Sequence, residues 1–168
     1  MAQDLEKKFD EICEALDNLA IKNLELIEEK VLLTVSLEKS IRQGHINLAK
    51  ARYIRGKENV GILQIPSKEH DIKSLFDLET TFRNSEEDKQ EKDFPHYDIC
   101  LKKCGEGEDE PQNPIKWFGV LVPQSLKIAQ KHFQDALYVA VRLANLQAEL
   151  AKTKRQSDSL KVLKTEAA

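Results

Sequence analysis

The 168-residue sequence has few of the residues that end regular secondary structure, with only 6 glycines and 5 prolines. A β-sandwich or barrel needs turn residues about every 8–12 positions, so this scarcity argues against both. Aromatic residues make up only 6% of the chain, which suits a narrow helical interface better than a deep enzyme pocket. Leu, Ala, Glu and Lys are abundant instead, as is typical of long helices. The composition therefore predicts an elongated, mainly helical interaction protein.

Cysteines and long apolar runs are also scarce. Cys13, Cys100 and Cys104 are too few and too unevenly spaced for a disulfide framework, which indicates a reducing compartment. The longest uncharged stretch, residues 117–126, is about half the length that a membrane-spanning helix requires. The charged start of the chain does not resemble a signal peptide. We expect a soluble, cytosol-facing protein whose membrane association is indirect, through a partner.

The net charge of −3 is distributed unevenly along the chain. Residues 1–65 carry −1, residues 66–113 carry −7 and residues 114–168 carry +5. The acidic part also loses helical periodicity, and its low apolar content leaves too little burial to offset chain entropy. A weak helix over residues 72–82 is the alternative within it. The predicted organisation is a helical arm (1–58), a short extended segment or strand (59–65), an acidic and mostly disordered linker (66–113), a second extended segment or strand (114–123) and a C-terminal helical arm (124–168).

Apolar residues in the first forty positions recur at steps of three and four, the spacing of a helix packed against another helix. The apolar members of this seam are Leu5, Phe9, Ile12, Leu16, Leu19, Leu26, Leu33 and Leu37. Asn23 and Lys30 interrupt it, and polar seam residues select one register or partner. For Lys30, the alternative is that its stem lies along the seam while its ammonium reaches water. Four further residues widen the stripe enough for more than one partner helix: Leu24, Ile27, Val31 and Val35.

The end of the first arm combines glycine with basic residues. Gly44 either permits close approach of another segment or marks a weak point in the helix, and Gly56 is a plausible helix stop. Lys50, Arg52 and Arg55 are candidates for contact with a partner, although basic residues at a helix end are more often solvated. Such a basic helix end could also contact nucleic acid or anionic lipid, of which nucleic acid is disfavoured because the whole chain is acidic.

The C-terminal arm follows an apolar segment that contains the single tryptophan. Pro123 is acceptable in the first turn of a helix, and helical spacing of apolar residues resumes afterwards. Within this arm we take Leu146 and Leu150 as candidates for partner contact. The segments 60–65 and 115–122 could pair as antiparallel strands. The predicted fold class is therefore mainly all-α: an antiparallel helical hairpin or coiled coil, closed by a short two-stranded β ribbon, with a disordered acidic linker.

One group of residues could bind zinc. His96, Cys100 and Cys104 are four positions apart, which on a helix would align them on one face, with His70 or a carboxylate as a fourth ligand. The spacing differs from that of common zinc modules and lies in the predicted linker, so incidental cysteines are the simpler interpretation. The sequence contains no phosphate-binding loop, HExxH motif or nucleophile elbow. We predict no catalytic residue, cofactor or metal, and so no enzyme.

Two blocks of sequence resemble a known family. Residues 46–64 (INLAKARYIRGKENVGILQ) and 113–137 (NPIKWFGVLVPQSLKIAQKHFQDAL) are similar to the coiled-coil domain-containing protein 115 family, metazoan counterparts of a fungal endoplasmic-reticulum factor for assembling the vacuolar proton ATPase. The family or structural positions that we carry over are Gly44, Leu48, Ala49, Tyr53, Gly56, Gly61, Gln64, Trp117, Phe118, Gly119, Leu121, Pro123, Ser125, Leu126 and Phe133. We expect Tyr53, Trp117, Phe118 and Val122 to form a local core that joins the two arms.

The resemblance implies a non-catalytic assembly factor at the cytosolic face of the endoplasmic reticulum and the ER–Golgi intermediate compartment. It implies pairing with a transmembrane assembly factor similar to transmembrane protein 199, and a role in building the membrane-embedded proton-conducting sector from its subunits. It also implies COPI-coated vesicles, endosomes and lysosomes as sites, with lysosomal acidification as the outcome. The alternative is a generic tether or prefoldin-like module unrelated to the pump, which would oligomerise through its strands.

Overall fold

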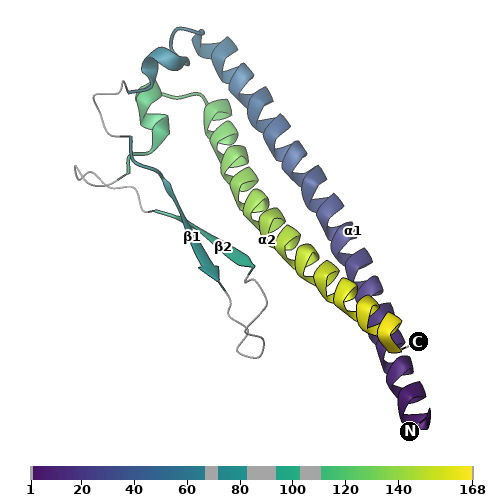
Figure 1. Ribbon diagram of the computed structural model, residues 1–168. Helices are drawn as coiled ribbons and strands as arrows, with labels where there is room; N and C mark the ends of the chain where they lie inside the picture. The colour runs from purple at the N-terminus through teal and green to yellow at the C-terminus, as the bar shows by residue number, and fades with distance from the viewer. Residues whose placement is uncertain (1, 67–71, 83–93, 103–110, 168) are drawn as a thin grey trace. The chain divides into compact units, whose positions relative to one another are not determined.

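The computed structural model describes residues 2–66, 72–82, 94–102 and 111–167, and these are mainly helical (Figure 1). The elements in chain order are helix α1 (Ala2–Arg55), 3₁₀ helix η1 (Ile62–Gln64), strand β1 (Phe76–Phe82), strand β2 (Pro95–Leu101), 3₁₀ helix η2 (Pro114–Phe118) and helix α2 (Gln124–Ala167). The chain forms two compact units. Unit 1 is Met1–Thr34, Thr81–His96 and Arg142–Ala168, and unit 2 is Val35–Thr80 and Tyr97–Val141. Each unit thus contains a stretch of both helices and of both strands.

The two long helices begin and end where local chemistry dictates. Neither contains a proline, and α1 runs for 54 residues before Gly56 adopts a φ of +86°, which glycine tolerates at little cost. The side-chain amide of Asn59 donates to the carbonyl of Arg55 at 2.8 Å and satisfies a carbonyl in the last turn. The predicted helix stop at Gly56 is confirmed. At the start of α2, the amide of Leu126 donates to the carbonyl of Pro123 at 3.0 Å.

In unit 1, the apolar seam of α1 packs against α2. Leu26 and Leu33 are buried on α1, and Leu146 is buried on α2. All the predicted seam residues of unit 1 from Phe9 onward are buried or half-buried, and so are Asn23 and Lys30. The heptad pattern therefore predicted the packed face correctly.

The helix segments of unit 1 run antiparallel. The ammonium of Lys164 lies 5.2 Å from the ring centre of Phe9, whereas Arg142 pairs with Glu29 at 3.4 Å. A higher residue number on α1 thus matches a lower one on α2. The predicted antiparallel helix pairing is present within this unit.

Unit 2 has its own small core at the end of α1. Ala51, Val60 and Leu126 are buried there, and three half-buried residues pack against them: Leu48, Phe118 and Val122. Further along the helix pair, a Cβ atom on Gly44 would lie 2.8 Å from Cε1 of Phe133, so only glycine leaves room for this ring. Gly44 therefore permits close approach of α2. Because residues 44 and 51 meet residues 133 and 126, the helix segments of unit 2 also run antiparallel.

The two-stranded antiparallel sheet is formed by β1 and β2. The amide of Lys102 donates to the carbonyl of Leu75 at 2.9 Å, and the hydroxyl of Thr81 lies 3.4 Å from the carbonyl of His96. Both contacts follow one antiparallel register. In unit 2, the ring of Phe76 contacts Tyr138 of α2 edge-on at 5.8 Å between centroids.

The predicted ribbon exists, but we placed it on the wrong residues. The segments 59–65 and 114–123 contain the 3₁₀ helices η1 and η2 instead of strands. Side-chain amides bond to the local backbone in both segments, which favours tight turns over an extended ladder. The strands lie inside the predicted linker, so its description as mostly disordered is wrong for residues 76–82 and 95–101. The alternative of a weak helix over residues 72–82 is also wrong, because residues 76–82 form strand β1. The remaining stretches of the linker, 67–71, 83–93 and 103–110, lie outside the described residues.

Candidate interaction surfaces

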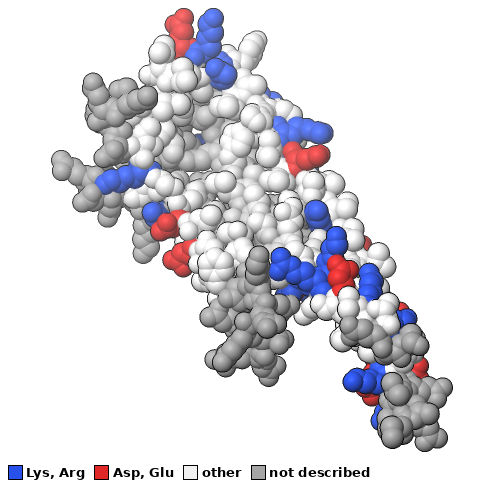
Figure 2. All heavy atoms as spheres, viewed as in Figure 1, with Lys and Arg blue, Asp and Glu red and all other residues white. Residues whose placement is uncertain are grey.

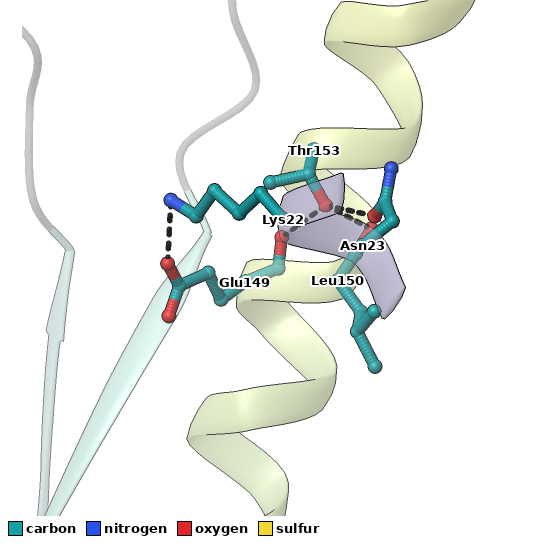
Figure 3. A network of polar contacts seen from close by, with 5 residues as sticks. All are labelled: Lys22, Asn23, Glu149, Leu150 and Thr153. Carbon is teal, nitrogen blue, oxygen red and sulfur yellow. Dashed lines mark hydrogen bonds and ion pairs between the residues drawn. The ribbon is translucent and has the colours of Figure 1, made fainter. Parts of the chain in front are cut away.

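A polar network interrupts the apolar seam of unit 1 (Figure 3). The hydroxyl of Thr153, which is only 2% exposed, donates to Oδ1 of Asn23 at 2.6 Å. The carbonyls of Glu149 and Leu150 lie 3.2 and 3.1 Å from the same hydroxyl. Lys22 and Glu149 form an ion pair at 2.9 Å beside it. The polar seam residue predicted to select a partner thus pairs with the second helix of its own chain.

The opposite face of α1 in unit 1 carries no such partner among the described residues. Five large apolar side chains are exposed on it: Ile21, Leu24, Ile27, Val31 and Leu32. Their helical spacing places them away from the buried Leu26 and Leu33. Leu24, Ile27 and Val31 belong to the widened stripe of the sequence pattern. The seam is used within the chain, and the added width leaves an apolar face open to a second element, which we call the α1 outer face.

In unit 2, the loop after α1 is fixed by the side chain of Gln64. Its Oε1 accepts from the amide of Gly61 at 2.9 Å, and its Nε2 donates to the carbonyl of Glu58. A Cβ atom on Gly61 would lie 2.8 Å from the carbonyl oxygen of Lys57, so the turn requires glycine. Two of the family positions therefore act together to hold η1.

The loop before α2 is fixed by Asn113, a residue that the sequence analysis did not single out. Its Oδ1 accepts from the amide of Ile115 at 3.1 Å and from Nε2 of Gln130 at 2.8 Å. The first bond caps η2, and the second ties it to α2. An Asn immediately before a Pro at the start of a short helix is the signal that could have revealed it. Gly119 ends η2 with a φ of +97°.

The three basic candidates are exposed, but they are not equivalent. Arg52 donates from Nε to the carbonyl of Val60 at 3.0 Å and so holds the loop against the unit 2 core. A Cβ atom on Gly119 would lie 3.8 Å from the guanidinium of Arg55, which places that group beside the second loop. Lys50 is exposed, and its side chain makes no hydrogen bond or ion pair with any other described residue. Only Arg52 has a clear structural role.

Several predicted side-chain environments need correction. Tyr53 was expected in the local core but is 92% exposed, because the last turn of α1 turns Ala51 inward and Tyr53 outward. Leu146 was a candidate for partner contact but is 6% exposed, so the folded unit 1 leaves it unavailable. Leu150 is half-buried. Trp117, Phe118 and Val122 are half-buried, and the last two pack against the unit 2 core.

The other family positions divide by exposure. Gly44 and Leu126 are buried; Leu48, Gly61, Gln64, Pro123, Ser125 and Phe133 are half-buried; Ala49, Gly56, Gly119 and Leu121 are exposed. The hydroxyl of Ser125 is buried without a hydrogen-bond partner among the described residues. The Ser125 hydroxyl therefore makes no hydrogen bond that would offset the cost of its burial.

The zinc alternative loses its geometric basis. His96 and Cys100 lie on strand β2, where residues four apart are about 13 Å apart, too far to share an ion. Cys104 and His70 lie outside the described residues. Among the residues that the structure describes, no three His, Cys, Asp or Glu side chains gather in a metal-binding group.

Within the described part of the chain, neither helix is apolar enough over a sufficient length to cross a membrane.

Comparison with known proteins identifies the family of this chain. A model of the family Vma22/CCDC115 matches residues 17–136, which is more than two thirds of the sequence. The chain belongs to the Vma22/CCDC115 family. The matched range contains the first block that carried the sequence resemblance and all but the last residue of the second, and that resemblance is confirmed.

Three curated relatives share the name "Vacuolar ATPase assembly protein VMA22". The protein from Mus musculus is 32% identical over 151 residues, covering 82% of this chain and 84% of the relative. The protein from Danio rerio is 30% identical over 176 residues, with 82% of each chain covered. The protein from Homo sapiens is 31% identical over 147 residues, covering 79% and 81%. The similarity therefore spans most of both chains in each comparison.

Proposed function

We propose that this chain is a non-catalytic assembly factor for the vacuolar-type proton ATPase. The observation that carries the proposal is the family match over residues 17–136. It is supported by relatives that align with this chain over most of their length and that are named as vacuolar ATPase assembly proteins. An assembly factor acts by binding, and the α1 outer face offers an apolar surface for a protein partner.

The finer proposal concerns what the factor assembles and with which partner. We propose that it acts on the membrane-embedded proton-conducting sector, and that it pairs with a transmembrane assembly factor similar to transmembrane protein 199. Its place would be the cytosolic face of the endoplasmic reticulum and the ER–Golgi intermediate compartment, with COPI-coated vesicles, endosomes and lysosomes as further sites. Acidification of these organelles would then depend on it. The two sequence blocks 46–64 and 113–137 support these points by resemblance.

For the partner's contact surface we propose the α1 outer face, with Leu150, Lys50, Arg52 and Arg55 as further candidates. Ile21, Leu24 and Val31 follow the spacing by which an apolar helix face enters a groove. Exposed aliphatic side chains on a helix lose contact with water when such a partner binds. Leu146 is withdrawn from the candidates because it is already buried.

The test is complementation in cells that lack their own relative of this protein. The surface variant combines Ile21→Ser, Leu24→Ser and Val31→Ser. Its matched control combines Glu11→Ser, Asn18→Ser and Glu25→Ser, three exposed residues on a different stripe of α1. We expect the wild-type chain and the control to restore organelle pH and to co-purify membrane-sector pump subunits from solubilised membranes. The surface variant should do neither, although its circular dichroism stays that of the wild type.

Three results would contradict the proposal or a part of it. If loss of the relative leaves pump assembly and organelle pH unchanged, or if the wild-type chain fails to restore them, the assembly role is wrong. If the surface variant complements as well as its control, only the assigned contact surface is wrong. A prefoldin-like module would instead form oligomers through its strands, so a measured mass of two or more chains that falls on disrupting β1 would favour that alternative.

A further inference from the structure

Two loops of unit 2 expose aliphatic side chains almost completely. The exposed fractions are 80% for Ile62, 87% for Leu63, 99% for Val120 and 80% for Leu121. Val60 lies just before the first pair, and Phe118 and Val122 flank the second. These three residues pack in the same core, so both pairs emerge at one end of unit 2. We call the four exposed residues the loop tip.

The backbone holds these side chains outward. Beyond the bonds of Gln64, the amide of Ile65 donates to the carbonyl of Ile62 at 3.2 Å. The amide of Gly119 donates to the carbonyl of Lys116 at 3.3 Å. The first bond, with those of Gln64, orders the loop that carries Ile62 and Leu63, and the second, with those of Asn113, orders the turn before Val120 and Leu121. Contiguous exposed apolar residues on a soluble protein commonly mark a site that binds a protein or a membrane. The loop tip has this character, so we treat it as an interaction surface.

The chemistry around the loop tip is basic. Residues 50–66 and 113–128 contain six Lys and Arg residues and a single acidic one, Glu58, a net charge of +5 in a chain of net −3. The basic residues are Lys50, Arg52, Arg55, Lys57, Lys116 and Lys127, and all are exposed. Figure 2 shows basic side chains, with acidic atoms beside them, next to uncharged surface at this end. Tyr53, almost fully exposed, adds an aromatic ring of the kind found at membrane interfaces.

We propose that the loop tip binds directly to the interface of membranes that contain anionic phospholipids. The four aliphatic side chains enter the boundary between headgroups and acyl chains, and the basic residues meet the headgroup phosphates. Two adjacent pairs on projecting loops lack the helical stripe that fits a protein groove, whereas a bilayer interface accepts any apolar projection. The contact adds to partner-held membrane association and revises the expectation that this association is only indirect. This membrane contact does not rest on the proposed role in pump assembly, because the isolated chain would make the contact by itself.

The test uses the full chain and vesicles of phosphatidylcholine with about 30% phosphatidylserine, compared with pure phosphatidylcholine. The tip variant combines Ile62→Ser, Leu63→Ser, Val120→Ser and Leu121→Ser. Its matched control replaces four aliphatic residues of the α1 outer face: Ile21→Ser, Leu24→Ser, Val31→Ser and Leu32→Ser. In flotation assays the wild type and the control should bind the anionic vesicles, and the tip variant should bind about tenfold less. Lys57→Glu with Lys116→Glu, or a rise in salt from about 0.1 to 0.5 M, should weaken binding as well.

Trp117, the single tryptophan, supplies a second readout in the unmodified protein. It lies in η2, three residues before Val120, so lipids with brominated acyl chains should quench its fluorescence. Absence of vesicle binding by the wild type overturns the proposal, and so does equal binding by the tip variant and its control. Unquenched Trp117 in vesicle-bound protein also overturns it, because another surface would then make the contact. Any of these results would leave a protein partner as the occupant of the loop tip.

Discussion

The hydroxyl of Thr153 on α2 donates a hydrogen bond to the side-chain amide oxygen of Asn23 on α1, one of the two polar residues that interrupt the apolar seam of α1. This bond crosses 130 residues of sequence and joins two polar groups that the packed helices shield from water. A buried polar pair of this kind allows only the helix register in which the two residues meet.

A double-mutant cycle tests this pair. Thr153→Val leaves the amide of Asn23 without its donor, and a partly buried unpaired group costs about 1–3 kcal/mol of unfolding free energy. Replacing both, with Asn23→Leu and Thr153→Val, should recover most of this loss, as apolar packing replaces the polar pair. Urea unfolding followed by circular dichroism gives the values. Thr34→Val is the control, because the hydroxyl of Thr34 is exposed and bonds only to the carbonyl of Lys30 on its own helix. Equal losses at positions 34 and 153 would refute the register role.

Gly44→Ala should destabilise unit 2, against the usual preference of helices. At an open helix position this change stabilises by about 1 kcal/mol. Here the added methyl group would lie 2.8 Å from the ring of Phe133, and overpacking costs about 1–3 kcal/mol. We therefore expect a lower thermal midpoint, and a smaller effect of Gly44→Ala in a Phe133→Leu background. Ser36→Ala on the same helix is the control and should change little. A midpoint raised by Gly44→Ala would show that the ring has room to move.

Charge reversal should separate the roles of two neighbouring basic residues. Arg52→Glu removes the donor to the carbonyl of Val60 and should cost about 1–2 kcal/mol in urea unfolding. Lys50→Glu should stay within about 0.5 kcal/mol of the wild type, as most exposed substitutions do. Arg52 is thus expected to stabilise the fold, in addition to the partner contact for which the sequence makes it a candidate. Lys39→Glu on the same helix provides the reference for a bare charge change, and a loss at position 52 no larger than this reference would contradict the assignment.

Ser125→Ala should leave stability unchanged or raise it slightly. The hydroxyl is buried without a hydrogen-bond partner among the described residues, so its removal avoids a desolvation cost and loses no bond. We expect an unfolding free energy equal to the wild type or higher by up to about 1 kcal/mol. A loss of more than about 1 kcal/mol would mean that the hydroxyl has a partner in solution.

The helices were predictable because the three-four spacing of their apolar residues extends over many turns. The three-four spacing from Phe9 to Leu37 averages out single exceptions such as Asn23, and the packed face follows from it. Thr153 was missed because it lies where the apolar pattern of the second arm thins, so that nothing in the sequence pairs it with a residue 130 positions earlier. Its position becomes meaningful only once the helices are antiparallel.

The strands were missed for the opposite reason. Phe76, Leu78 and Thr80 alternate with acidic residues, as in a strand with one apolar face. The charged runs on either side lowered the average over a longer window and hid this alternation. Conversely, the apolar runs 59–65 and 115–122 predicted strands, yet only Val60 among the first is deeply buried. Local bonds from Gln64 and Asn113 determine those loops, and such bonds depend on geometry that a hydropathy pattern does not contain.

The two close approaches between the helices of unit 2 set a rule for how relatives of this chain can vary in length. Gly44 and Ala51 are seven positions apart on α1, and their counterparts Phe133 and Leu126 are seven apart on α2. Seven positions are one full heptad, so within unit 2 both contacts fall on the same face of α1. An insertion in one helix between these points would break one contact or the other. Evolution can therefore lengthen or shorten this stretch only by matched changes in both helices, in steps that keep the heptad phase.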